Sequence, residues 1–225
     1  MSEGARYFDR ALVMDSLMLT GPVLCDLVDE VAGHSCSEHL TSLLALHARL
    51  ASRVQSDPDE RLLIITELTD GQGRLQDGMA LLADLQDLRL QGRCRVVVCT
   101  GQTDPLLLKA VVNRRPSVVV LRREPLDALR MSVQMAGVAW PDTVLSPAVT
   151  EGMMLTRDVT LSPRELEFLV TQADGLGLKA SAKVMNISYK TVATYRHNLT
   201  RRLERGRKGA FSWRMAQIQK AGGSG

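Results

Sequence analysis

The chain has 225 residues, of which 45% are hydrophobic and 24% are charged, the balance of a globular protein in water. No apolar run approaches the about 18–20 residues that a membrane-spanning helix needs, and the first ten residues lack the apolar core of a signal peptide. These features argue against a membrane protein and predict a cytoplasmic one. The four cysteines have neither CxxC nor other metal-ligand spacing, so we expect reduced thiols and no bound metal or other cofactor.

The net charge of +3 is unevenly distributed along the chain. Residues 151–225 contain 13 Lys and Arg against 6 Asp and Glu, whereas residues 1–150 contain 15 against 19. An acidic front part joined to a basic back part indicates two domains, the second facing a polyanion. Basic surfaces also serve solubility, so charge alone leaves both interpretations open.

Four short runs rich in aliphatic and β-branched residues predict buried strands in the first 140 residues. They are residues 11–14, 62–66, 95–99 and 117–121. Segments with helical spacing of apolar residues occur around 23–31, 40–50, 79–88, 106–111 and 126–133. Strands that alternate with helices predict a parallel sheet covered by helices on both faces. A fifth strand is expected near residues 31–37, although VAGHSCS is a poor strand sequence.

The alternation is lost over residues 138–160, whose two prolines and one glycine predict a linker. The remaining chain is expected to be helical. Its first helix opens with Ser162 as N-cap, Pro163 as first helical residue and Glu165 completing a capping box, and it stops at Gly175. A short helix then follows, and after it a tight turn at 186–188, a longer helix over 189–203 and an amphipathic segment near 210–220.

Helical spacing sorts residues 189–203 into two opposite faces. The apolar face carries Val192, Leu199 and Leu203, with Tyr195 at its margin, and the other face is polar and cationic without an opposing acid. A short helix, a three-residue turn and such a helix form a helix-turn-helix, whose second helix enters the major groove of DNA. A solvated helix face is the plainer alternative.

The segment LSPRELEFL…ADGLGLKASAKVMNISYKTVATYRHNLTRRL resembles the DNA-binding domain of the LuxR/NarL/FixJ family. The similarity lies in the LSPRE opening, the Gly175 break, the NIS turn, the KTV motif at 190–192, and the pairs Asn198-Leu199 and Arg202-Leu203. It implies a double-stranded DNA ligand. The implied DNA-binding residues are Ala193, Thr194 and His197 facing bases, Lys179, Lys190, Arg201 and Arg202 at phosphates, and Thr191 and Asn198 within the same interface.

Two positions depart from the family pattern. Ser181 stands where the family usually has an apolar core residue, and we expect it to loosen the packing of the domain. Tyr195 stands where the family often has histidine.

In that family the front half is often a receiver domain, so the resemblance implies a flavodoxin-like α/β fold with a five-stranded parallel sheet. The positions that match the receiver's phosphorylation pocket are Asp15, Ser16, Glu67, Thr100 and Arg122. A receiver carries there two acids, a phosphoacceptor aspartate, a Thr or Ser, and a lysine. Three of the five positions therefore differ.

Each difference weakens the chemistry of phosphoryl transfer. Ser16 removes one acid that would help to hold Mg²⁺, which prefers carboxylate and other oxygen ligands. Glu67 moves its carboxylate by about 1 Å or more relative to an aspartate. Arg122 replaces a compact ammonium group with a planar fork. We therefore expect a pseudo-receiver with a degenerate phosphorylation pocket, which does not use the acyl-phosphate switch.

Glu67 has two interpretations. It is either a solvated loop residue left after phosphorylation was lost, or a permanent negative charge that pairs with Arg122 or Thr100 and holds an active-like arrangement. The loop after it, ELTDGQGRLQDG, is long and resembles that of the Rcs-type capsule and stress regulators. That group includes auxiliary members with degenerate receivers that act as heterodimers with a phosphorylatable partner.

The sequence therefore predicts a transcription regulator rather than an enzyme, acting on DNA as a homodimer or as a heterodimer with a related response regulator, without a membrane partner. The expected domains are a pseudo-receiver for dimerisation at 1–140, a linker at 141–156, a helix-turn-helix domain at 157–220 and a flexible tail at 221–225.

Three alternatives remain open. One is a small-molecule-sensing LuxR-type regulator, against which the 4% aromatic content argues because ligand pockets need apolar and aromatic lining. Another is an enzyme with Glu67 and Asp15 as acid–base partners, although no His, Cys or Ser motif accompanies them. The third is an antagonist that sequesters a related regulator.

Overall fold

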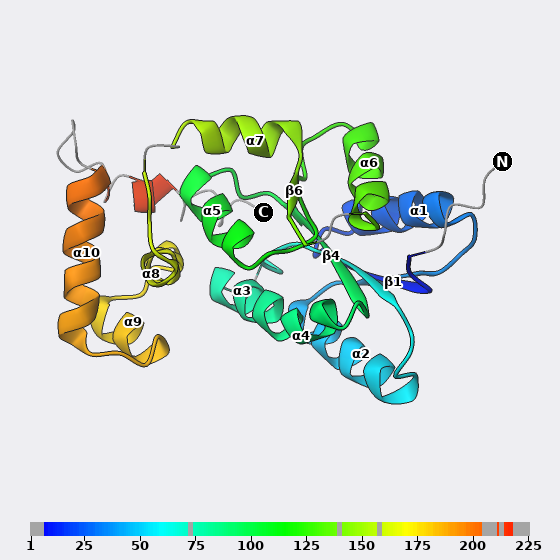
Figure 1. The fold of residues 1–225 in the computed structure, drawn as a ribbon, viewed down its shortest axis with the longest axis horizontal. Coiled ribbons are helices and arrows are strands. Elements are labelled where there is room, and N and C mark those ends of the chain that lie inside the picture. Colours follow the sequence, from blue (N-terminus) through cyan, green and yellow to red (C-terminus); the bar gives the residue numbers. More distant parts are fainter. Residues whose placement is uncertain are drawn as a thin grey trace. The chain divides into compact units, whose positions relative to one another are not determined.

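The computed structural model describes residues 7–71, 74–138, 141–156, 159–203, 211 and 214–217. Within these ranges the chain forms a six-stranded parallel sheet in the order β2-β1-β3-β4-β5-β6, seen in Figure 1 between two sets of helices. The strands are β1 (Arg10–Met14), β2 (Ser37–Leu40), β3 (Leu62–Thr66), β4 (Cys94–Thr100), β5 (Val118–Leu121) and β6 (Val144–Leu145). The expected parallel α/β fold is confirmed, and β6 adds a short sixth strand at its edge.

The central strands are buried because nearly all of their residues are aliphatic or β-branched, the pattern of a parallel sheet covered on both faces. Every residue of β3 is buried, whereas no residue of the edge strand β2 is. β1 and β3 are in register from Arg10 opposite Leu62 to Met14 opposite Thr66. The strands are parallel, so the residues that follow β1, β3, β4 and β5 meet at one edge of the sheet.

Two layers of helices cover the sheet. They are α1 (Thr20–Ala32) and α6 (Leu126–Ala136) on one face, and α2 (Leu43–Ser56), α3 (Leu75–Asp84) and α4 (Gln86–Leu90) on the other (Figure 1). Apolar side chains of α1 and α6 pack on alternate residues of the strands. This core cluster includes Val13, Leu24, Leu27, Val28, Leu63, Ile65, Val97, Val120, Leu129 and Val133.

Contacts along the chain separate it into two units. The first comprises Met1–Gly101 and Arg114–Thr150, and the second comprises Gln102–Asn113 and Glu151–Gly225. The helices of the second unit are α5 (Pro105–Asn113), α8 (Pro163–Ala173), α9 (Leu178–Val184) and α10 (Tyr189–Leu203). α8 packs against α5, α9 and α10.

The expected helix start at residue 162 is confirmed. Ser162 Oγ accepts from the Glu165 N–H at 3.3 Å, the Glu165 carboxylate accepts from the Ser162 N–H at 2.8 Å, and Pro163 is the first helical residue. Gly175 has a positive φ of 75°, a backbone conformation that glycine adopts readily, and it ends the segment as expected.

The expected linker at 141–156 differs from its prediction, because it contains β6 and α7 (Pro147–Met154). These elements are short, and Pro147 can begin a helix although it would break one in the interior. The limits 1–140, 157–220 and 221–225 stay predictions. The tail and most of the amphipathic segment near 210–220 lie outside the described residues, although Phe211 and Met215 are described and buried. No helix in the described ranges combines the length and apolarity needed to cross a bilayer.

Candidate functional site

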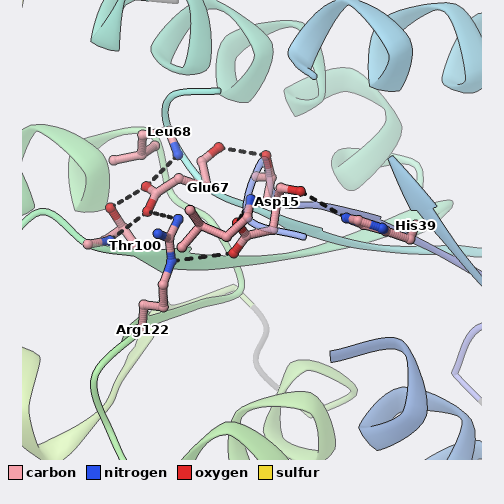
Figure 2. A network of polar contacts seen from close by, with 9 residues as sticks. Asp15, His39, Glu67, Leu68, Thr100 and Arg122 are labelled. Atoms are coloured by element: carbon pink, nitrogen blue, oxygen red, sulfur yellow. Dashed lines mark hydrogen bonds and ion pairs between the residues drawn. The ribbon is translucent and has the colours of Figure 1, made fainter. Parts of the chain in front are cut away.

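Glu67 follows β3 and lies at the centre of a network of polar contacts (Figure 2). Its Oε1 accepts hydrogen bonds from the Leu68 N–H at 2.7 Å and from Thr100 Oγ1 at 2.5 Å. Its Oε2 accepts from the Gly101 N–H at 2.6 Å and from Arg122 Nη2 at 2.7 Å. The ends of three strands thus supply four donors to one carboxylate.

Arg122 joins this carboxylate to a second one. Its Nε lies 3.3 Å from Asp15 Oδ2, and the Asp15 side chain is only 1% exposed. Asp15 is fixed in turn by the Leu17 N–H, which donates to Oδ1 at 2.9 Å, and the Arg122 backbone N–H donates to the Thr100 carbonyl at 2.9 Å. The guanidinium group therefore lies between the acids that follow β1 and β3.

The pKa of the Glu67 carboxyl reflects two opposing effects. Burial raises the pKa above its ordinary value and outweighs the Thr100 hydrogen bond, the Arg122 charge and the two backbone N–H groups, which lower it. Three of the four donors are N–H groups, which can only donate, so the contacts suit an ionised carboxylate. Glu67 is 5% exposed, so its interpretation as a solvated loop residue is wrong. The contacts match the alternative of a charge paired with Arg122 and Thr100.

The residues present do not fit the Mg²⁺ ion that a phosphorylatable receiver would hold. Arg122, a cation, already contacts both Asp15 and Glu67. Ser16, which stands where a receiver has its second acid, offers no carboxylate; it is half-buried, and its hydroxyl lies on the side of Gly71. No group of three or more metal-binding side chains occurs among the described residues.

Sequence patterns missed some participants in the network. The Leu68 and Gly101 contributions are backbone N–H groups, which leave no signal in the side-chain sequence. His39 on β2 contacts the Asp15 carbonyl through Nε2 at 2.8 Å and packs so closely on Gly21 that a Cβ there would lie 1.9 Å away.

α9, a tight turn and α10 form the second candidate site, a helix-turn-helix. Asn186 has a positive φ of 52° in the turn, and Ser188 Oγ accepts from the Thr191 N–H at 3.1 Å to cap α10. Val192 and Leu199 are fully buried, as the helical pattern predicted. The opposite face is exposed, and it consists of Lys190, Thr194, His197 and Arg201, with Arg196 beside them.

The other residues expected at the interface differ in accessibility. Lys179 on α9 is exposed, whereas Ala193, Asn198 and Thr191 are half-buried. The Thr191 hydroxyl bonds to Ser188 Oγ at 2.8 Å. The Thr194 hydroxyl donates to the backbone carbonyl four residues earlier at 3.0 Å, which leaves its oxygen as an acceptor on the exposed face.

Arg202 has structural contacts that its sequence position did not indicate. Its Nη1 donates to Glu165 Oε2 at 2.9 Å and to the Thr160 carbonyl at 2.8 Å. Because Glu165 is also the capping-box carboxylate of α8, Arg202 fastens the end of α10 to the start of α8. A phosphate contact by Arg202 would compete with this pair, whereas Arg201 faces solvent.

Ser181 was expected to loosen the packing of the helical domain, but it is well packed. It is fully buried, and its Oγ accepts from Thr171 Oγ1 at 2.8 Å and from Gln172 Nε2 at 3.0 Å. These bonds join α8 to α9 where the family usually has apolar contact. Buried polar groups with satisfied hydrogen bonds can specify a core as apolar packing does.

Comparison with known proteins defines the class to which both units are similar. Residues 159–208 match the model of the luxR family of bacterial regulatory proteins, and this range contains α8, α9 and α10. Together with the receiver-like sheet, the match shows that the chain resembles a response regulator of the LuxR/NarL type.

Particular relatives agree with this class. The virulence-factor transcription regulator BvgA of Bordetella pertussis is 35% identical over 134 residues, which cover 56% of this chain and 63% of BvgA, less than two thirds of its length. Among solved structures, RcsB of Salmonella enterica serovar Typhimurium bound to promoter rprA has a TM-score of 0.68 at 19% identity, covering 93% of this chain and 98% of RcsB. RcsB bound to promoter P1flhDC has a TM-score of 0.62 at 18% identity, covering 94% and 98%. The expected likeness to Rcs-type regulators is thus confirmed for the fold.

Proposed function

We propose that this protein is a DNA-binding transcription regulator whose receiver-like unit works without phosphorylation. The observation that carries the proposal is the Arg122 guanidinium, 2.7 Å from Glu67 and 3.3 Å from Asp15. In a phosphorylated receiver, charge at this edge of the sheet changes when a phosphoryl group is added. Here the Glu67 carboxylate and the Arg122 guanidinium supply a charge pair without phosphorylation, and the Thr100 hydroxyl is hydrogen-bonded to that carboxylate.

The helix-turn-helix would bind double-stranded DNA with α10 in the major groove. Thr194 and His197, exposed on the middle of α10, would reach base edges, and Ala193 would contact them at the margin. The exposed cations Lys179, Lys190 and Arg201 would bind phosphates. We assign Arg202 mainly to holding α8. Counterions are released when phosphates are neutralised, so binding would weaken steeply as salt is added.

The receiver-like unit would mediate pairing of two regulators. The partner would be a second copy or a related regulator of the Rcs type, which would place two α10 helices on half-sites about one helical turn apart. RcsB itself has been solved as two dimers bound to two parallel DNAs. A protein with this role would work in the cytoplasm, where its DNA is.

Sequencing of the DNA that the full-length protein retains from sheared genomic fragments tests this proposal directly. Enrichment of one two-half-site sequence, lost when Thr194 and His197 are both replaced by alanine, is the expected result. Retention of no preferred sequence, or of the same sequence by the double variant, would contradict it. Co-purification of a related regulator without any bound DNA would instead favour the antagonist.

A further inference from the structure

The turn that carries Arg122 is closed by a second acid, Glu124. The Glu124 N–H donates to the Leu121 carbonyl at 3.0 Å, and Glu124 Oε1 accepts from the Leu121 N–H at 2.9 Å. The side chain thus folds back onto the end of β5, and two bonds fix the backbone on both sides of Arg122.

The same oxygen of Glu124 reaches the start of α7. Ser146 Oγ donates to Glu124 Oε1 at 2.5 Å, and Ser146 is only 6% exposed. Ser146 directly precedes Pro147, the first residue of α7, and its Oγ accepts from the Val149 N–H at 3.4 Å. A carboxylate and a serine hydroxyl at this place are the groups that stabilise a helix N-terminus. Glu124 therefore supports the cap of α7.

One four-residue turn thus has contacts at both ends. At one end Arg122 contacts Glu67 and Asp15, and two residues later Glu124 contacts Ser146. The Arg122 N–H is also bonded to the Thr100 carbonyl, so the turn has little freedom to absorb a change at one end alone. A shift of the guanidinium would change the backbone that positions the Glu124 carboxylate.

We infer that Glu124 is a positioning residue, which holds Arg122 against Glu67 and couples that network to the Ser146 cap of α7. The inference deepens the proposed function, because it gives the network at the sheet edge a route to the segment that leads into the DNA-binding unit. α7 begins in the first unit, and its residues from Glu151 onward belong to the second.

Hydrogen exchange of the full-length protein, measured by mass spectrometry without DNA, tests the coupling. Ser146→Ala and Glu124→Ala should each make the amides of Val149 and Thr150 exchange about fivefold faster, the factor expected when an N-cap hydrogen bond is lost. Glu67→Gln should also speed exchange at these amides, although it lies at the other end of the turn. In the Ser146→Ala background, Glu67→Gln should add nothing, because the route is already cut.

Two matched substitutions control for general loosening of the first unit. Glu30→Gln removes a carboxylate that pairs with Arg130 on α6, and Ser132→Ala removes a hydroxyl that bonds within α6. Neither should change exchange at Val149 and Thr150.

The coupling is refuted if Glu67→Gln leaves exchange in α7 unchanged, or if it has an equal effect with and without the Ser146 hydroxyl. If Glu124→Ala does not fold, the Glu67 and Ser146 variants alone decide the matter. The readout contains no DNA, so it separates failure of this inference from failure of the proposed function. Normal coupling in a protein that binds no preferred DNA sequence would contradict the function alone.

Discussion

Replacement of Glu67 by glutamine removes the charge of the central carboxylate while it keeps the shape of the side chain. One acceptor oxygen becomes an NH₂ group, which can only donate. In either orientation of the amide, this group faces a backbone N–H, either that of Leu68 at 2.7 Å or that of Gly101 at 2.6 Å. No rotation of the side chain removes the clash between donors.

The cost of this change follows from those contacts. A buried N–H that loses its acceptor costs about 1–3 kcal/mol, and a hydrogen bond to a charged group contributes about 1.5–3 kcal/mol. Arg122 keeps its contact with Asp15, and its side chain is 23% exposed. Only part of the contribution of the Arg122–Glu67 hydrogen bond is therefore lost. Relief of the cost of burying the Glu67 charge offsets a further part. We therefore expect the free energy of unfolding to fall by about 2–3 kcal/mol.

Urea unfolding followed by circular dichroism measures this loss. The double variant Glu67→Gln, Arg122→Gln should cost less than the sum of the two single variants, because the two residues form one pair. Glu30→Gln, at an exposed ion pair, should show no measurable loss. A Glu67→Gln protein as stable as the wild type would refute the argument that its donors require an ionised carboxylate.

Three further results are expected. Thr194→Ala should change which DNA sequence is preferred, at about 1–3 kcal/mol per lost base contact, whereas Lys190→Ala should weaken binding to all sequences alike. Fluorescence anisotropy measures both affinities. Equal effects of Thr194→Ala on target and random DNA would contradict the assignment of the base-reading face. Ser181→Ala should lower the free energy of unfolding by about 1–2 kcal/mol in urea melts, because Thr171 Oγ1 and Gln172 Nε2 each lose one hydrogen bond and keep one to a backbone carbonyl. An unchanged midpoint would contradict a stabilising role for the Ser181 hydroxyl. Burial raises the pKa of Cys94 and Cys99 to about 12, so at pH 8 iodoacetamide should label both thiols only after unfolding. Peptide mass spectrometry detects the label, and rapid labelling of the folded protein would contradict the burial of these thiols.

Sequence predicts the parts of this fold whose signal is local. β3 and β4 are runs of buried aliphatic and β-branched residues, and the capping box at Ser162 is a short motif with a fixed spacing. β2 is weak in sequence because it lies between the helices at the sheet edge and buries no residue fully. β6, with two residues, is too short for an alternation to be visible, which is why the expected linker held unexpected structure.

The same distinction applies to the candidate site. Asp15, Glu67, Thr100 and Arg122 could be placed together because they match the phosphorylation pocket of the receiver domain that the chain resembles, and each follows a predicted strand. The backbone donors of the network carry no side-chain signal, and the Arg202–Glu165 pair joins residues 37 apart in the chain. Such contacts depend on tertiary packing, and no periodicity within one segment reports them.

The affinity of the full-length protein for its enriched DNA sequence, with and without Mg²⁺ and beryllofluoride, tests the central claim most directly. Beryllofluoride mimics a phosphoryl group on a receiver carboxylate and needs a divalent cation to bind. Because Arg122 already contacts both acids, we predict the same affinity under both conditions. Tighter DNA binding in the presence of beryllofluoride would show that the pocket still responds to phosphoryl chemistry and would contradict the account.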